Sequence, residues 1–134
     1  MSRRRRRARA FGLHAEIAAA LLLRLKWYKI LARNFSASGG EIDLIARRGA
    51  TIAFVEVKAR PTLEEAGFAI GSVKAARISR AARAWLVANP WAVGLSFRGD
   101  AVYVAPLRLP RHVEAAIPLD LPVTAHPSIG LRFG

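Results

Sequence analysis

Residues 40–58, GEIDLIARRGATIAFVEVK, carry the strongest structural signal of the chain because they contain two strand-like segments around a turn. The segments at residues 41–46 and 51–58 are rich in aliphatic, β-branched and aromatic residues, which favour extended structure. Residues 47–50 join them. We therefore predict an antiparallel hairpin.

The charged side chains of this hairpin are predicted to share one face of the sheet. Side chains alternate along a strand, so Glu41 and Asp43 share a face of the first strand, and Glu56 and Lys58 share a face of the second. The register set by the turn places Glu41 opposite Glu56 and Asp43 opposite Phe54. Carboxylates on a half-buried surface repel one another and lose hydration, so a cation must compensate them.

Two interpretations of this cluster stay open at the level of the residues. Lys58 supplies one positive charge, and a hard divalent cation such as Mg²⁺ or Mn²⁺, bound through oxygen ligands, would supply the rest. Alternatively, Glu56 and Lys58 form an ordinary ion pair on a half-exposed sheet, where such pairs contribute little stability.

The hairpin is expected to lie in an α/β domain with the element order α-β-β-β-α-β-β and a mixed central sheet flanked by helices. The expected elements are a helix at 11–26, strands at 28–35, 41–46 and 51–58, a helix at 73–88, and strands at 91–97 and 101–105 around a turn at Arg98-Gly99-Asp100. Prolines after residue 107 predict loop and tail. We expect a disordered Arg-rich arm at residues 1–10, one domain at 11–117 and a proline-containing tail at 118–134.

The chain has 134 residues, enough for one domain, and it is strongly basic. Its 22 Lys and Arg residues outnumber nine Asp and Glu residues, which gives a formal net charge of +13 and indicates a polyanionic partner. The absence of cysteine excludes disulfides and Cys-based zinc sites. The apolar run at residues 18–23 is too short to span a membrane, so we expect a cytoplasmic protein without a membrane partner.

The first expected helix carries a carboxylate on the face that should pack on the sheet. Glu16 shares a stripe with Leu13, Ala20 and Leu23 at helical spacing, so it could join the acids of the hairpin. Alternatively, it is an acid near the helix start, favoured by the helix dipole and reaching water past small alanines.

Basic residues on the second expected helix form a ridge opposite a packing face that contains Ile78 and Trp85. The ridge has no interleaved acids, which favours phosphate binding over a merely solvated polar face. The predicted nucleic-acid-binding residues are Arg47, Arg48, Arg60, Lys74, Arg77, Arg80 and Arg83. The three tryptophans lie in or beside hydrophobic runs, so we expect them in the core rather than stacked on bases.

Residues 39–45, GGEIDLI, and 54–60, FVEVKAR, resemble the signature of the YraN family of restriction-endonuclease-like proteins, relatives of Holliday-junction resolvases and other PD-(D/E)xK nucleases. The similarity continues in the first helix, the first strand and the second helix, and it covers roughly residues 11–117. Two positions depart from the family pattern: Ala75 stands where many relatives carry Gln, and Gly99 stands where an aromatic residue is usual.

The resemblance implies a site and a role for each of its residues. The implied metal ligands are Asp43, Glu56, Glu16 and the backbone carbonyl of Val57. Lys58 would be the catalytic lysine, which orients the attacking water or stabilises the charge that develops on the phosphate. Glu41 matches a recurrent family position and is expected to support the ligands rather than hold the metal.

These observations predict a metal-dependent nuclease that hydrolyses DNA, with branched or structured DNA as the candidate substrate and Mg²⁺ or Mn²⁺ as cofactor. Related resolvases are dimers, so a homodimer is an open expectation. The main alternative is a nuclease-fold module that binds nucleic acid without turnover. A third is a basic adaptor for ribosomes or anionic membranes, in which the Arg-rich arm would carry most of the binding.

Overall fold

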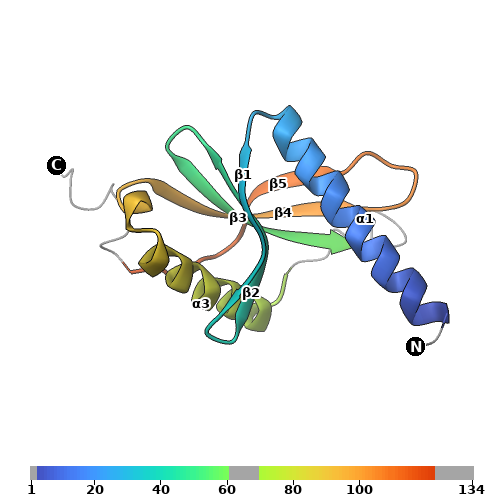
Figure 1. Ribbon diagram of the computed structural model, residues 1–134, viewed down its shortest axis with the longest axis horizontal. Helices are drawn as coiled ribbons and strands as arrows, with labels where there is room; N and C mark the ends of the chain where they lie inside the picture. Colours follow the sequence, from blue (N-terminus) through green and yellow to red (C-terminus); the bar gives the residue numbers. More distant parts are fainter. Residues whose placement is uncertain (1–2, 61–69, 123–134) are drawn as a thin grey trace.

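The computed structural model in Figure 1 describes residues 3–60 and 70–122, with side chains from residue 13 onward within those ranges. Its elements are α1 (Arg3–Leu25), β1 (Lys29–Ala37), β2 (Gly40–Arg48), β3 (Thr51–Ala59), α3 (Ser72–Ala88), the short 3-10 helix η1 (Pro90–Ala92), β4 (Ser96–Val104) and β5 (Arg111–Ile117). The α/β class and the α-β-β-β-α-β core are confirmed.

Five strands form one mixed sheet in the order β1-β2-β3-β4-β5. β3 and β4 are parallel neighbours, whereas the other neighbours are antiparallel. A parallel pair needs a crossover connection, and α3 lies in the connection from β3 to β4.

The two helices cover opposite faces of the sheet. Phe54 of β3 packs against Trp85 of α3, with ring centroids 5.8 Å apart. Val55, the next residue, belongs to the cluster that contains Leu23 of α1. β3 is therefore buried on both faces, which explains why its sequence is a nearly continuous apolar run.

The β2–β3 hairpin forms as predicted, but its register differs from the prediction by two residues. Arg48 pairs with Thr51, so the turn consists of Gly49 and Ala50 alone. Gly49 has a φ of 61°, the left-handed conformation that tight two-residue hairpin turns require. A shift of two residues leaves the same side chains on each face but changes which ones are neighbours.

The predicted turn at Arg98-Gly99-Asp100 is wrong, because these residues lie inside the single strand β4. A Cβ on Gly99 would lie 2.5 Å from the carbonyl oxygen of Ile117, so glycine here permits close approach of the neighbouring chain. The residues at 91–95, predicted as strand, form η1 and a short connection instead.

The prediction of loop beyond residue 107 is also wrong over Arg111–Ile117, which forms the edge strand β5. Pro110 and Pro118 stand just outside the strand, where a missing N–H does not interrupt the pairing with β4. Residues 118–122 have no regular structure, in keeping with the predicted tail. The rest of that tail, 123–134, lies outside the described residues.

The backbone of α1 is helical from Arg3, whereas we predicted a disordered arm over residues 1–10 and a helix only from residue 11. Arg and Ala are strong helix formers, and extension of an existing helix needs no new nucleation, so charge repulsion does not end the helix there. Neither α1 nor α3, the helices of the described part of the chain, is long and apolar enough to cross a membrane.

Candidate active site

A pocket of about 410 Å³ opens at the end of the sheet where β3 finishes, between α1 and the first turn of α3. Two elements on opposite faces of the sheet thus contribute to one cavity. The lining residues are Ala15, Glu16, Asp43, Glu56, Val57, Lys58, Ala59, Arg60, Ile70, Gly71 and Lys74.

Asp43 reaches this pocket at the point where β2 separates from β3. The pairing of the two strands runs from the turn to Leu44 and Val55. Beyond it, the Asp43 carboxylate takes the place of a backbone acceptor: its Oδ2 accepts a hydrogen bond of 2.8 Å from the backbone N–H of Val57. Strict alternation also fails here, since Ile42 joins the cluster under α3. Val57, whose N–H is bonded to Asp43, therefore lines the pocket at the point where the strands separate.

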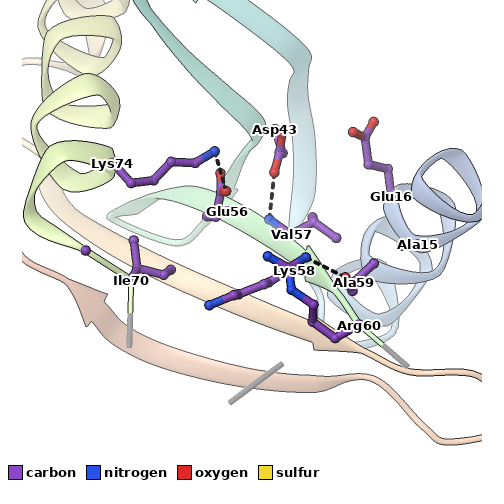
Figure 2. A pocket seen from close by; sticks show the side chains of 11 residues that line it. Ala15, Glu16, Asp43, Glu56, Val57, Lys58, Ala59, Arg60, Ile70 and Lys74 are labelled. Carbon is purple, nitrogen blue, oxygen red and sulfur yellow. Dashed lines mark hydrogen bonds and ion pairs between the residues drawn. The ribbon is translucent and has the colours of Figure 1, made fainter. Parts of the chain in front are cut away.

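Glu56 lies beside Asp43 and is almost buried, with 8% of its surface exposed. Lys74, in the first turn of α3, places its Nζ 3.0 Å from Glu56 Oε2, while its side chain remains 47% exposed. Figure 2 shows the Lys74 side chain reaching Glu56, with Asp43 on the other side of Glu56. The predicted placement of Glu41 opposite Glu56 is wrong, because the observed register makes Asp43 the neighbour.

The two carboxylates cannot both ionise freely in this setting. Burial raises the pKa of Asp43 to about 7, and the charge of Glu56, together with a hydrogen bond between the two carboxyl groups, contributes to the rise. The N–H of Val57 and the ammonium of Lys74 act in the opposite direction. Near neutral pH, Asp43 is therefore in equilibrium between its protonated and ionised forms, a state that a bound cation would shift toward ionisation.

Glu16 projects from α1 on the other side of the pocket, as Figure 2 shows. Burial raises the pKa of Glu16, and the negative charges of Asp43 and Glu41 add to the effect, whereas a hydrogen bond with Asn34 opposes it. Within residues 3–60 and 70–122, however, no three or more His, Cys, Asp or Glu side chains form a group that could hold a metal ion. The structure thus joins Asp43 and Glu56 closely and leaves Glu16 at the rim.

The other predicted site residues of the hairpin separate into two groups. Lys58 lines the pocket from β3, next to the carboxylate pair along the strand. Glu41 is exposed and does not line the pocket, although its charge reaches Glu16.

The predicted phosphate-binding residues also divide by position. Lys74 and Arg60 line the pocket, and Arg77 and Arg80 continue from it as exposed residues along α3. Arg83 lies further along the helix, where its guanidinium is 3.7 Å from the carboxylate of Asp120.

Two predicted phosphate-binding residues lie at the opposite end of the hairpin from the pocket. The guanidinium of Arg47 lies over the ring of Trp91 at 5.4 Å, and that of Arg48 lies over Tyr28 at 4.5 Å. Arg48 also pairs with Glu114 at 3.7 Å. These two arginines therefore pack against the fold as well as carrying charge, and they are not part of the pocket.

A buried charge network in the sheet was missed by the sequence analysis. Asp100 is fully buried, and its carboxylate is hydrogen-bonded to Arg98 at 2.7 and 2.8 Å, to His112 at 2.8 Å and to the N–H of Ala115 at 3.0 Å. Arg98 also donates to the hydroxyl of Tyr28 at 2.5 Å. The sequence did contain a signal for it, because Arg98 and Asp100 are two residues apart and would share one face of a strand. The Gly and Asp of the same tripeptide are also typical of a turn, which is the structure that we predicted.

The network holds Asp100 in its ionised form. Burial opposes ionisation, but the hydrogen bonds from His112, Arg98 and Ala115 outweigh it and lower the pKa of Asp100 to about 2. This cluster joins the start of β1 to β4 and β5 and is separate from the pocket.

The chain matches the family model described as "Uncharacterised protein family UPF0102" over residues 15–104, which is more than half of its length. The chain belongs to the UPF0102 family. The matched region begins at Ala15 and ends at Val104, so it contains every residue that lines the pocket.

Curated UPF0102 proteins of several bacteria are similar to this chain over most of its length. One from Methylorubrum extorquens is 59% identical over 117 residues, which are 87% of this chain and 91% of the relative. One from Methylobacterium nodulans is 56% identical over 89% of this chain and 92% of the relative. One from Methylocella silvestris is 59% identical over 87% and 94%, respectively.

Proposed function

We propose that this UPF0102 protein is a metal-dependent nuclease of the YraN and PD-(D/E)xK type that hydrolyses phosphodiester bonds in DNA. The observation that carries the proposal is the pair of adjacent carboxylates, Asp43 and Glu56, at the edge of a pocket whose other charged groups are mostly cationic. An acidic centre with a basic rim fits a site that must attract a polyanion and still hold a cation beside it.

The donor atoms fit a hard divalent cation. Mg²⁺ is commonly bound by one or two carboxylates, with water in its remaining positions, so Asp43 and Glu56 suffice without a third acid. Val57 directs its N–H toward Asp43, and its carbonyl points to the same side of the strand, where β2 no longer pairs. Asp43, Glu56 and this carbonyl would hold Mg²⁺ or Mn²⁺, and Glu16 would act from the rim through water.

When bound, the cation would polarise the scissile phosphate and lower the pKa of a coordinated water. The chain itself supplies charge and position. Lys58 can orient a water at the pocket or neutralise charge on the phosphate. Lys74 neutralises Glu56 from the half-exposed side, from which its ammonium can also reach a phosphate at the rim. Arg60, Arg77 and Arg80 extend the positive surface beyond the pocket.

The test is metal-dependent nicking of linear, single-stranded and branched DNA by the purified full chain. Asp43→Asn and Glu56→Gln should each abolish nicking with Mg²⁺ or Mn²⁺, because each removes a charged ligand. Glu114→Gln, a half-exposed carboxylate outside the pocket, is the matched control and should retain activity. Equal nicking by the wild type and both pocket variants would identify a contaminant and contradict the proposal.

Calorimetric titration with Mn²⁺ separates the metal site from the reaction. The wild type should bind Mn²⁺, and binding should be lost in Asp43→Asn and Glu56→Gln but not in Glu114→Gln. A wild-type protein that binds no Mn²⁺ at neutral pH would contradict a metal-dependent reaction at this pocket.

A second candidate is a nucleic-acid-binding module that keeps this fold without turnover. It is favoured by the ion pair between Lys74 and Glu56, which compensates one carboxylate without a metal, and by the position of Glu16 at the rim. It predicts salt-dependent DNA binding that Lys58→Ala leaves unchanged, with no cleavage of any substrate. Cleavage that Lys58→Ala reduces by orders of magnitude would exclude it.

A further inference from the structure

The outward face of α1 carries a row of large aliphatic side chains. Within the described residues, no other part of the fold buries them. The row recurs every four residues, which places its members on one face of the helix. Its members and their exposed fractions are Leu13 (57%), Ile17 (48%), Leu21 (52%) and Leu25 (80%). Trp27, just beyond the helix, is 87% exposed. We call these five residues the α1 row.

The α1 row lies opposite the face by which the helix packs on the sheet. Ala15, Ala19 and Leu23 are buried against the sheet, and they lie on the other side of the helix at 100° per residue. Leu13, expected to pack on the sheet, and Trp27, expected in the core, are instead exposed. A contiguous exposed apolar surface rimmed by charged residues is typical of a contact with a partner.

The charges around the α1 row are positive. Arg24 and Lys29 are exposed beside its C-terminal end, and the backbone of α1 continues from its N-terminal end through residues 3–9, six of which are arginine. The only acid in α1 is Glu16, which is half-buried and lines the pocket beside the row. The partner of the row must therefore be both apolar and negatively charged at its edges.

A second exposed apolar segment has the same composition. Leu107 and Leu109, in the loop from β4 to β5, are both almost fully exposed; Arg108 lies between them, and Arg111 follows two residues after Leu109. The loop follows Val104, which packs in the same cluster as Ala15 of α1. Two parts of the molecule that meet in one cluster thus present exposed aliphatic side chains together with arginines.

We propose that the α1 row and the 107–109 loop dock this protein on an anionic lipid surface. A helix that lies in the plane of a bilayer inserts an apolar face and keeps basic residues at the level of the headgroups, and tryptophan favours that boundary. The arginines would contact anionic headgroups, and the row would enter the acyl boundary. Glu16 lies about 60° around the helix from Leu13, toward the face buried on the sheet, so the pocket borders the proposed contact.

Two other partners fit the α1 row less well. Nucleic acid would satisfy the arginines, but it offers no apolar surface for four exposed aliphatic side chains. A second copy of the chain would cover the row, but each copy carries a net charge of +13, and an antiparallel pair of α1 helices would bring the arginine-rich segment of one near Arg24 of the other.

The test is sedimentation of the full chain with vesicles of phosphatidylglycerol and phosphatidylethanolamine, compared with vesicles of phosphatidylcholine alone. We expect binding to the anionic vesicles only. Ile17→Glu/Leu21→Glu should weaken it by about tenfold or more, because two charges replace inserted apolar side chains. Val87→Glu, at a more exposed aliphatic position (83%) on α3, is the control and should bind as the wild type does.

Several outcomes would overturn the proposal. The first is a wild type that does not bind anionic vesicles, and the second is a variant Ile17→Glu/Leu21→Glu that binds them as strongly as the wild type. The third is a wild-type dimer that the same variant converts to a monomer, because this result would assign the row to a second copy of the chain. Circular dichroism verifies that the variant is folded, and Leu107→Ser/Leu109→Ser tests the loop independently with the same readout. None of these measurements depends on the proposed nuclease activity.

Discussion

Asp43 illustrates how one side chain can have a structural and a chemical role at once. It accepts the hydrogen bond of Val57 where the β2–β3 pairing ends, and it presents the rest of its carboxylate to the pocket beside Glu56. Its raised pKa is the consequence of burial next to another acid.

The Asp43 carboxylate should make the stability of the metal-free protein depend on pH. Its pKa is raised to about 7 in the fold, from about 4 in the unfolded chain, so the folded state binds more protons between these values and stability falls as the pH rises from about 4 to 7. Asp43→Asn should remove about 1–3 kcal/mol of this pH dependence. Urea unfolding at a series of pH values measures it.

Addition of Mn²⁺ at pH 7 should stabilise the wild type but not this variant. A wild type whose stability is the same at pH 5 and pH 7, without metal, would contradict the raised pKa.

Asp100 shows the opposite behaviour for a buried carboxylate, because Arg98, His112 and the N–H of Ala115 satisfy both of its oxygens. The network also holds strands in place relative to one another, because its members come from β4, from β5 and, with Tyr28, from the residue just before β1.

Asp100→Asn should destabilise the protein by about 3–5 kcal/mol at pH 7, because it removes a fully buried charge from a network in which the half-buried Arg98 loses its bidentate partner. In the wild type, the pKa of Asp100 is lowered to about 2, so its contribution is present above about pH 4 and is lost as the pH falls from 4 toward 2. Guanidinium unfolding measures both effects. Glu114→Gln, which changes only a half-exposed partner of Arg98, should cost less than about 1 kcal/mol, and an equal loss in both variants would contradict the network's role.

At the scale of the elements, the second turn of α3 is positioned by a close contact between Arg77 and the start of β2. A Cβ on Gly40 would lie 1.9 Å from the carbonyl oxygen of Arg77, a distance that no rotamer change relieves, because the clash is with backbone. This contact fixes the helix that carries Lys74 to the strand that carries Asp43.

Gly40→Ala should therefore destabilise the fold by about 2–4 kcal/mol and displace Lys74 from Glu56. Gly71→Ala is the matched control, because a Cβ there meets nothing within 4 Å, and it should cost less than about 1 kcal/mol. Thermal unfolding gives the comparison, and an equal midpoint for the two variants would contradict the close packing of α3 on β2.

At the scale of the whole molecule, the basic residues predicted to bind phosphate lie on two separate surfaces, one next to the pocket and one at the turn end of the hairpin. Arg77 and Arg80 are exposed next to the pocket, whereas Arg47 and Arg48 lie over aromatic rings at the far end of the hairpin. The proposed DNA path therefore runs from the pocket along α3.

Arg77→Ala/Arg80→Ala should weaken DNA binding and reduce the slope of log affinity against log salt by about 1.8, or about 0.9 for each phosphate that the variant no longer neutralises. Arg47→Ala/Arg48→Ala removes the same charge at the other end of the hairpin. It should change the slope by less than about half of the change that Arg77→Ala/Arg80→Ala causes. Fluorescence anisotropy at several salt concentrations measures both slopes. Equal slopes for the two double variants would contradict a path along α3.

The sequence alone was enough to predict the α/β class, the hairpin and the second helix, because these follow from local periodicity and composition. It did not determine β5 or the interior position of Asp100, because those depend on pairing between residues far apart in the chain.

Only the tertiary structure decided which acid neighbours Glu56, which basic residues line the pocket and which face of α1 remains exposed. A two-residue change in hairpin register leaves the pattern of faces intact, so the sequence pattern cannot distinguish the two registers. The position of Glu16 and the exposure of Leu13 depend on how α1 sits on the sheet, which is set by the buried alanines and Leu23 acting together.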